Sequence, residues 1–198
     1  MQTFPNPGRK MPKYNADETD AFCGKFPSDS SKLFQELARD NGWDGETDVF
    51  FGFRKALNID SLAKKQAERN GNSVSSCDMA FKLDSKETLL CEMKLKIKKV
   101  KDLNKQLKKI PEKAHGSISL LRAYGGFHQD VYVVFDKDLY AESRDRLARI
   151  FDSCGQSFKQ TVKGFKSCNM PEFCEIFRPE KGEKDCFGKL RSSCGRME

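Results

Sequence analysis

The residues of this chain best suited to chemistry are Asp78, Glu92 and Lys94. If they project from one face of two neighbouring strands, the carboxylates oppose each other with Cβ atoms roughly 5 Å apart. Like charges at that distance repel unless a cation lies between them, and carboxylate oxygens are the ligands that hard divalent cations prefer. Two carboxylates and a lysine on one sheet face are typical of a site that handles a metal ion and a phosphate.

An alternation of apolar and polar residues predicts the two strands that would position these groups. The apolar residues take the odd positions: Cys77, Met79, Phe81 and Leu83 in segment 76–83, then Leu89, Cys91, Met93, Leu95 and Ile97 in segment 87–97. Period two indicates strands with one buried face, and the polar segment 84–86 has the length of a hairpin turn. A three-residue loop centred on Ser85 pairs residues whose numbers sum to 170, which places Asp78 opposite Glu92.

Positive charge is concentrated just after this hairpin. The 198-residue chain carries a net charge of +7, and segment 94–113 alone holds nine lysines against Asp102 and Glu112. A local basic surface beside an acidic site suits a polyanion, most simply nucleic acid. The lysines expected to contact phosphates are Lys96, Lys98, Lys101 and Lys105. On charge alone, a solvated lysine-rich helix face explains the segment equally well.

Composition and cysteine spacing favour an intracellular protein that is not secreted. No stretch approaches the roughly 20 apolar residues of a membrane span, and the N-terminus lacks the apolar core of a signal peptide. Eight cysteines occur without a Cys-x-x-Cys pair, which favours reduced thiols. A zinc site is the alternative for Cys168, Cys174, Cys186 and Cys194, although their spacing does not match paired zinc knuckles.

The order of predicted elements indicates an α/β fold with a mixed central sheet flanked by helices. Three regions are expected: an extended N-terminal arm over 1–28, an α/β core over 29–153, and a cysteine-rich C-terminal extension packed on the core over 154–198. The elements predicted besides the hairpin are helices near 31–39, 59–69, 100–110 and 139–151, a strand at 47–54, a short apolar element at 117–124 and a buried strand at 131–135. Pro111 is expected to end the third helix.

This arrangement resembles the PD-(D/E)xK nuclease superfamily. The resemblance rests on Asp78, a turn, Glu92-Met93-Lys94, a lysine-rich helix and a buried strand, and it covers roughly residues 29–151. It implies a restriction-endonuclease-like core, in which a helix with a carboxylate precedes a strand meander and a helix and a further strand complete the sheet. Two features depart from the family pattern: no proline precedes Asp78, and segment 43–75 offers only the short strand at 47–54, interrupted by Gly52, to begin the meander.

The resemblance also implies roles for particular residues. Asp78, Glu92 and the backbone carbonyl beside Met93 would bind Mg²⁺ or Mn²⁺, and Lys94 would orient the attacking water or stabilise the transition state. Glu36 matches the acidic residue of the preceding helix, a role for which Asp44, Glu46 and Asp48 compete. Gln106 matches a polar residue that the following helix presents near the site.

The implied function is hydrolysis of phosphodiester bonds, with DNA favoured over RNA as the partner and the oligomeric state, including a homodimer, left open. Two other functions stay open: an inactive nucleic-acid-binding module of the same fold, and a cysteine-rich interaction or metal-storage protein. The short motif alone does not decide, because Asp84-Ser85-Lys86 matches it in a turn. The two histidines, His115 and His128, are not near a cysteine in sequence, and nothing in the sequence singles out a Cys/His nucleophile pair.

Overall fold

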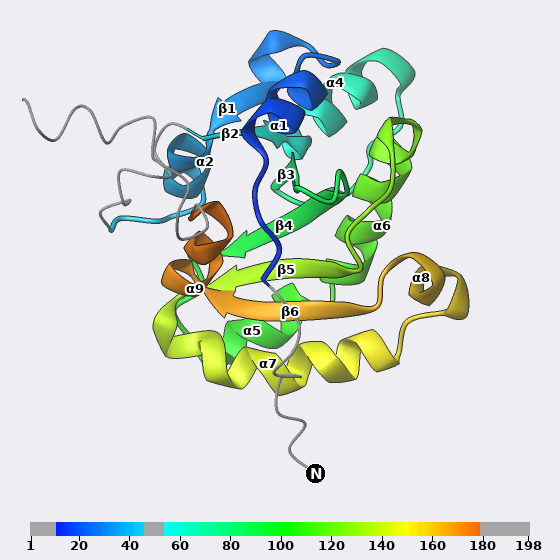
Figure 1. Ribbon diagram of the computed structural model, residues 1–198. Coiled ribbons are helices and arrows are strands. Elements are labelled where there is room, and N and C mark those ends of the chain that lie inside the picture. The colour runs from blue at the N-terminus through cyan, green and yellow to red at the C-terminus, as the bar shows by residue number, and fades with distance from the viewer. Residues whose placement is uncertain (1–10, 46–53, 179–198) are drawn as a thin grey trace, which may run out of the picture.

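The computed structural model describes residues 11–45 and 54–178. Its centre is one six-stranded sheet in which the strands lie in the order of the chain (Figure 1). The strands are β1 (Ser31–Leu33), β2 (Lys55–Asn58), β3 (Met79–Lys82), β4 (Thr88–Lys94), β5 (Asp130–Phe135) and β6 (Gly164–Asn169). Strands β1 to β4 form an antiparallel meander, whereas β4, β5 and β6 are parallel. The predicted α/β class with a mixed sheet is confirmed.

The hairpin formed by β3 and β4 has the predicted register. Met79 pairs with Cys91, and Phe81 pairs with Leu89. The turn that joins the strands places Lys86 at a φ of 64°, which allows a tight reversal. The expectation of one buried face is wrong, because Ala80 and Leu90 are buried on the opposite face of the hairpin. The alternation still favours this register, since a slip of one residue would move the larger apolar side chains of the odd positions to that opposite face.

Helices cover both faces of the sheet. They are α1 (Ala16–Cys23), α2 (Phe34–Asp40), α4 (Ile59–Asn70), α5 (Val100–Leu107), α6 (Ile110–Leu121), α7 (Lys137–Asp152), α8 (Gln156–Thr161) and α9 (Met170–Cys174). On the face that holds the odd residues of β3 and β4, Phe34 of α2 and Phe173 of α9 are buried against Phe81 and Met93. The opposite face packs against α1 and α6 near β3 and β4, and against α5 and α7 near β5. The described residues contain no helix that is both long and apolar enough to cross a membrane.

The structure differs from the predicted boundaries at both ends of the core. Segment 1–28 was expected to be an extended arm, but α1 lies within it and buries Phe22 against the sheet. The region after 153 is expected to be an extension packed on the core, but it supplies a strand of the sheet itself, β6, which pairs with β5. Short elements with little periodicity, such as these, acquire their structure from tertiary contacts rather than from a local pattern.

Two further elements were placed wrongly by the sequence pattern. Pro111 does not end a helix: it lies in the first turn of α6, where its missing N–H costs no hydrogen bond. The predicted apolar element at 117–124 is the continuation of this helix and a short 3₁₀ turn. Strand β2 begins at Lys55, directly after the predicted strand at 47–54, most of which lies outside the described residues.

Candidate active site

A pocket of about 440 Å³ lies at the carboxyl end of β4. Ten residues from the hairpin, the segment after α2, α5 and α6 line it: Asn41, Asp78, Met93, Lys94, Lys96, Ile97, Lys98, Asp102, Gln106 and Lys113. In an α/β sheet, ligands bind outside the carboxyl ends of the strands. The position of this pocket therefore agrees with that of a functional site.

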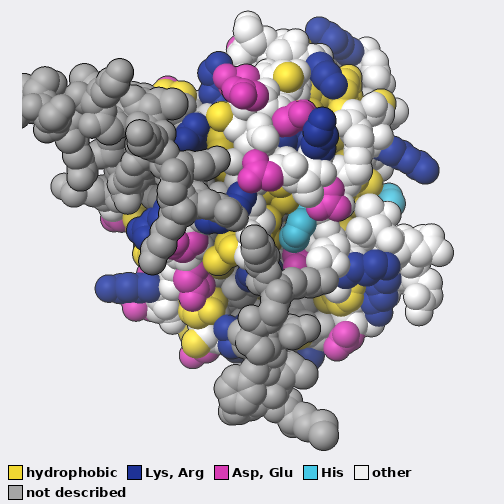
Figure 2. All heavy atoms as spheres, in the orientation of Figure 1, with side chains coloured by type: hydrophobic (Ala, Val, Ile, Leu, Met, Phe, Trp, Pro, Cys, Tyr) yellow, Lys and Arg dark blue, Asp and Glu magenta, His cyan; other side chains and the backbone are white. Residues whose placement is uncertain are grey.

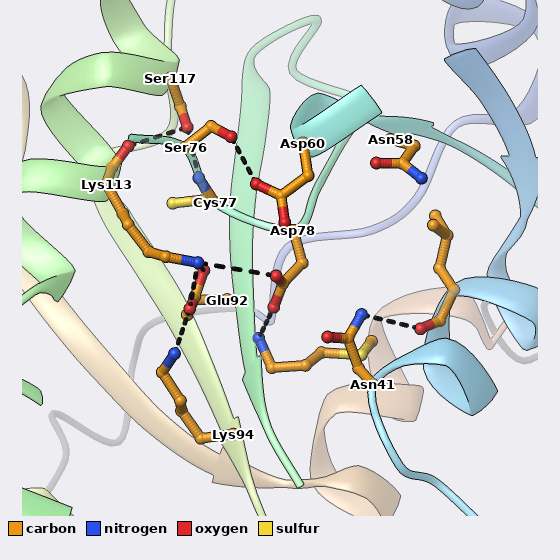
Figure 3. A network of polar contacts seen from close by, with 12 residues as sticks. Asn41, Asn58, Asp60, Ser76, Cys77, Asp78, Glu92, Lys94, Lys113 and Ser117 are labelled. Carbon is orange, nitrogen blue, oxygen red and sulfur yellow. Dashed lines mark hydrogen bonds and ion pairs between the residues drawn. The ribbon is translucent and has the colours of Figure 1, made fainter. Parts of the chain in front are cut away.

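Asp78 is held where β3 begins by the backbone of the neighbouring strand. Its Oδ2 atom accepts a hydrogen bond of 2.5 Å from the backbone N–H of Met93. This bond continues the contact between the two strands beyond the last ladder pair, Met79 and Cys91. Asp78 therefore lies beside Glu92 at the end of the hairpin, as Figure 3 shows.

Glu92 is the centre of the charged cluster. Lys94 donates to its Oε1 atom at 2.5 Å, and the Nζ atom of Lys113 lies 2.8 Å from Oε1 and 3.1 Å from Oε2 (Figure 3). Lys113 also lies 3.8 Å from Oδ1 of Asp78. The side chains of Asp78, Glu92, Lys94 and Lys113 are 8%, 0%, 11% and 19% exposed. Two carboxylates and two ammonium groups thus form a largely buried cluster.

The electrostatics of this cluster depend on burial and on the two carboxylates. Burial, and then the negative charge of Glu92, raise the pKa of Asp78 from 3.8 to about 7, although Lys113 opposes the change. For Lys113, burial alone would lower the pKa, but the attraction of Glu92 and Asp78 outweighs burial and raises it. Lys113 is therefore positively charged at neutral pH, whereas the pKa of Asp78 lies near neutral pH.

A hydrogen-bonded clamp fixes α6 against the segment that precedes Asp78. The hydroxyl of Ser117 accepts the backbone N–H of Cys77 at 2.8 Å and donates to the backbone carbonyl of Lys113 at 2.9 Å. Gly116 makes this approach possible, because a Cβ atom there would collide with the carbonyl oxygen of Ser75. The clamp sets the backbone positions from which Lys113 and Asp78 reach each other.

A third carboxylate lies behind the cluster. Asp60, in the first turn of α4, accepts a hydrogen bond of 2.6 Å from the hydroxyl of Ser76. The side chain of Asn58 caps the same helix by accepting the backbone N–H of Ser61. The negative charge of Asp60 contributes to the raised pKa values of Asp78 and Lys113.

Lys113 and Asp60 were not predicted as site residues. A signal for Lys113 existed in the sequence, because Ile110, Ala114, Ser117 and Leu121 form the buried stripe of α6 and Lys113 lies next to it. Recognising that stripe required placing Pro111 at the start of a helix rather than at its end. No local pattern singled out Asp60, which reaches the site only through the packing of α4.

The other predicted residues divide into two groups. Gln106, Lys96 and Lys98 line the pocket, whereas the exposed Lys101 and Lys105 lie on α5 away from it. Lys98 also pairs with Asp136 at 2.6 Å.

Glu36 is not brought to the pocket. Its carboxylate accepts the backbone N–H of Leu33 at 3.1 Å and so caps the start of its own helix. Asp44 is exposed and is not part of the pocket lining, and Glu46 and Asp48 lie outside the described residues.

Few side chains of the kinds that bind metal ions lie close together in the described part of the chain. Within 11–45 and 54–178, no group of three or more His, Cys, Asp or Glu side chains is arranged to hold a metal ion. Cys168 and Cys174 are both buried, and burial raises the pKa of the Cys168 thiol. Cys186 and Cys194, the other two residues of the zinc alternative, lie outside the described residues. The oxygen donors that line the pocket are thus the carboxylates of Asp78 and Asp102, the amide oxygens of Asn41 and Gln106, and backbone carbonyls, and the buried Glu92 lies next to Asp78.

Comparison of the chain with models of protein families, with curated proteins and with solved structures finds no match. The function must therefore be inferred from the residues of the site and the order of elements that bring them together.

Proposed function

We propose that this protein is a divalent-metal-dependent nuclease of the PD-(D/E)xK type, which hydrolyses phosphodiester bonds of nucleic acid, with DNA favoured over RNA. The observation that carries the proposal is the convergence of Asp78, Glu92 and Lys94 at one end of the hairpin, where Asp78 and Lys94 line the pocket and the fully buried Glu92 contacts Lys94. The order of elements supports it: α2, the β2–β3–β4 meander, α5 and α6, and then β5 parallel to β4 follow the sequence of elements that the family resemblance implies.

The residues at the pocket fit a small hard cation. Mg²⁺ is commonly held by one or two carboxylates and keeps several waters, so Asp78 and Glu92 suffice as protein side chains. Lys113 already lies near both carboxylates, which indicates that the site is built for positive charge. A residue of an antiparallel strand directs its N–H and C=O toward the same neighbour. Since the N–H of Met93 meets Asp78, its carbonyl is directed to the same side and is the natural third donor.

A bound divalent ion would supply a water of lowered pKa and neutralise charge on the scissile phosphate. The side chains around the pocket would position the attacking water and bind the nucleic acid. Lys94, anchored on Glu92, would place its ammonium group beside the attacking water and the developing negative charge. Lys96 and Lys98, on the rim of the pocket, would bind phosphates, and Gln106 would donate a hydrogen bond from α5.

Surface charge is consistent with a localised nucleic-acid contact. On the face shown in Figure 2, Lys and Arg side chains are interspersed with Asp and Glu side chains rather than gathered into one patch. The nine lysines of segment 94–113 instead begin with the last residue of β4, and four of them, Lys94, Lys96, Lys98 and Lys113, line the pocket. An intracellular location belongs to the same proposal, because Cys23, Cys77, Cys91, Cys154 and Cys168 are free thiols in the described part of the chain.

One observation favours a second candidate, an inactive nucleic-acid-binding module of the same fold. Lys94 and Lys113 together balance the charges of Asp78 and Glu92 without a metal ion. In this alternative the cluster only stabilises the end of the hairpin, and the basic rim binds nucleic acid without cleaving it.

A cleavage assay with Mn²⁺ or Mg²⁺ on single-stranded, duplex and branched DNA and on RNA separates the two candidates. We expect cleavage by the wild-type protein and its loss in Asp78→Asn and Glu92→Gln, two nearly isosteric changes that remove a carboxylate charge. Lys86→Ala, an exposed lysine at the hairpin turn, is the matched control. Binding of nucleic acid without cleavage under any of these conditions would refute the nuclease and favour the inactive module.

A further inference from the structure

The metal ligands of the proposed site are already occupied by a side chain. The Nζ atom of Lys113 lies 2.8 Å and 3.1 Å from the two carboxylate oxygens of Glu92 and 3.8 Å from Oδ1 of Asp78. We infer that Lys113 is a built-in competitor of the metal ion, whose ammonium group holds the two carboxylates in the metal-free protein and withdraws when a divalent cation binds. This inference rests on the proposed function.

The first step of the argument is that Lys113 and a divalent cation exclude each other. Mg²⁺ binds carboxylate oxygens at 2.0–2.1 Å and completes an octahedral shell with waters. An ammonium group bonded to both oxygens of Glu92 fills the space that this shell needs. Two cations that close together also repel strongly in a buried site, where the effective dielectric constant is low.

The second step is that the ammonium group of Lys113 can withdraw from the carboxylates, whereas that of Lys94 can stay on Glu92. Lys113 is the more exposed of the two lysines, and it reaches the cluster from α6 through a long side chain that lines the open pocket. Lys94 contacts only Oε1 of Glu92 and can stay there, so Glu92 keeps a partner after Lys113 has withdrawn. The clamp formed by Ser117 fixes the backbone of Lys113, so only the side chain has to move.

The third step is the consequence for binding. A cation that must first displace Lys113 binds more weakly than it would to free carboxylates. A neighbouring charge at 4–6 Å typically changes the protonation equilibrium of a carboxylate by one to three powers of ten, and a divalent cation experiences the same field. Removing the charge of Lys113 should therefore tighten metal binding by about 10- to 100-fold.

The test is isothermal titration calorimetry with Mn²⁺ alone and with Mg²⁺ alone. The variants are Lys113→Met, which removes the charge, Lys113→Gln, which keeps a hydrogen-bond donor in case the first fails to fold, and Lys113→Arg, which keeps the charge. Lys105→Met, an exposed lysine on α5, is the matched control. Thermal unfolding in chelator and in excess metal gives a second measurement that does not depend on cleavage.

We expect both neutral variants to bind metal about 10- to 100-fold more tightly and to be stabilised more by metal than the wild type, while Lys113→Arg and Lys105→Met are not. Metal binding by Lys113→Met but not by the wild type would support the inference in its strongest form. Equal or weaker binding in both neutral variants, with binding by the wild type intact, would overturn the inference and leave the nuclease proposal standing. Absence of binding in every variant would overturn both.

Discussion

Two lysines beneath the same face of the sheet, Lys82 and Lys113, show two ways in which this fold accommodates a buried cation. Lys82, at the turn end of the hairpin, is 6% exposed and donates to the backbone carbonyls of Lys86 and Tyr124, both at 3.1 Å. It also lies 5.1 Å from the centre of the Phe22 ring. Lys113, at the opposite end, faces the carboxylates of Glu92 and Asp78.

The two environments move the lysine pKa in opposite directions. Burial lowers the pKa of Lys82, and the nearby charge of Lys25 lowers it further. At Lys113 the carboxylates outweigh burial and raise the pKa. Carbonyl groups and an aromatic ring fix a cation in place but offer nothing that a metal ion or a phosphate could take over, whereas paired carboxylates do. The Lys82 end is thus structural, and the Lys113 end has the composition of a reactive site.

The largest functional effect is expected for a substitution of Lys94, at the same end of the hairpin as Lys113. Lys94→Ala should fold normally, because Glu92 keeps Lys113 as a partner, yet its cleavage rate should fall by roughly 10²–10³-fold. Metal binding should survive, since both carboxylates remain. Single-turnover cleavage together with metal titration measures the two properties separately. Wild-type cleavage by purified Lys94→Ala would mean that the chemistry takes place elsewhere.

The next effect concerns the pH dependence of stability at the reactive end. The folded-state pKa of Asp78, about 7, lies above its ordinary value of 3.8, so folding takes up a proton at intermediate pH. Stability from this group is present at low pH and disappears as the pH rises through 7. Without metal, we expect Asp78 to make the protein about 2–3 kcal/mol less stable at pH 8 than at pH 5.

Urea unfolding in chelator at pH 5, 6, 7 and 8 measures this decrease, and Asp78→Asn should flatten the profile over that range. A slope that persists unchanged in Asp78→Asn would assign the pH dependence to other groups. Saturating metal should also flatten the wild-type profile, because a cation favours the ionised carboxylate.

A smaller effect is expected at the structural end. Lys82→Met should destabilise the protein by about 1–3 kcal/mol, since two backbone carbonyls are left without their buried donor. Metal affinity and cleavage per folded molecule should not change. Unfolding in urea with and without metal checks both statements, and an altered metal affinity in this variant would show that the two ends of the hairpin are coupled.

The smallest change per substitution is expected on the basic rim. Replacing Lys96, Lys98, Lys101 and Lys105 by Gln one after another should flatten the salt dependence of binding to duplex DNA. Each phosphate that is no longer neutralised by a lysine should change the log–log slope by roughly 0.9. Fluorescence anisotropy at several salt concentrations measures this slope, with Lys86→Gln as the control. If only the pocket-lining Lys96 and Lys98 contribute, the nucleic acid touches the rim of the pocket and not α5.

The hairpin was predictable because the odd positions of both strands are apolar throughout and its loop is short. These two features together determined the register and therefore the meeting of Asp78, Glu92 and Lys94, which are local to one hairpin. The buried strand β5 was equally clear, because five consecutive apolar residues leave little choice of structure. Function in nucleic acid chemistry stays a prediction that rests on these residues and on the lysine-rich segment.

Period-two alternation and turn length are local properties, so the amino-acid sequence alone predicts which hairpin residues share one face of the sheet. The side chains that reach this site from other helices depend on tertiary packing. Lys113 and Asp60 reach the site because α6 and α4 pack against the segment around Ser76, and Glu36 stays away because it caps its own helix. Such contacts depend on how distant elements pack, and no spacing along the chain records them.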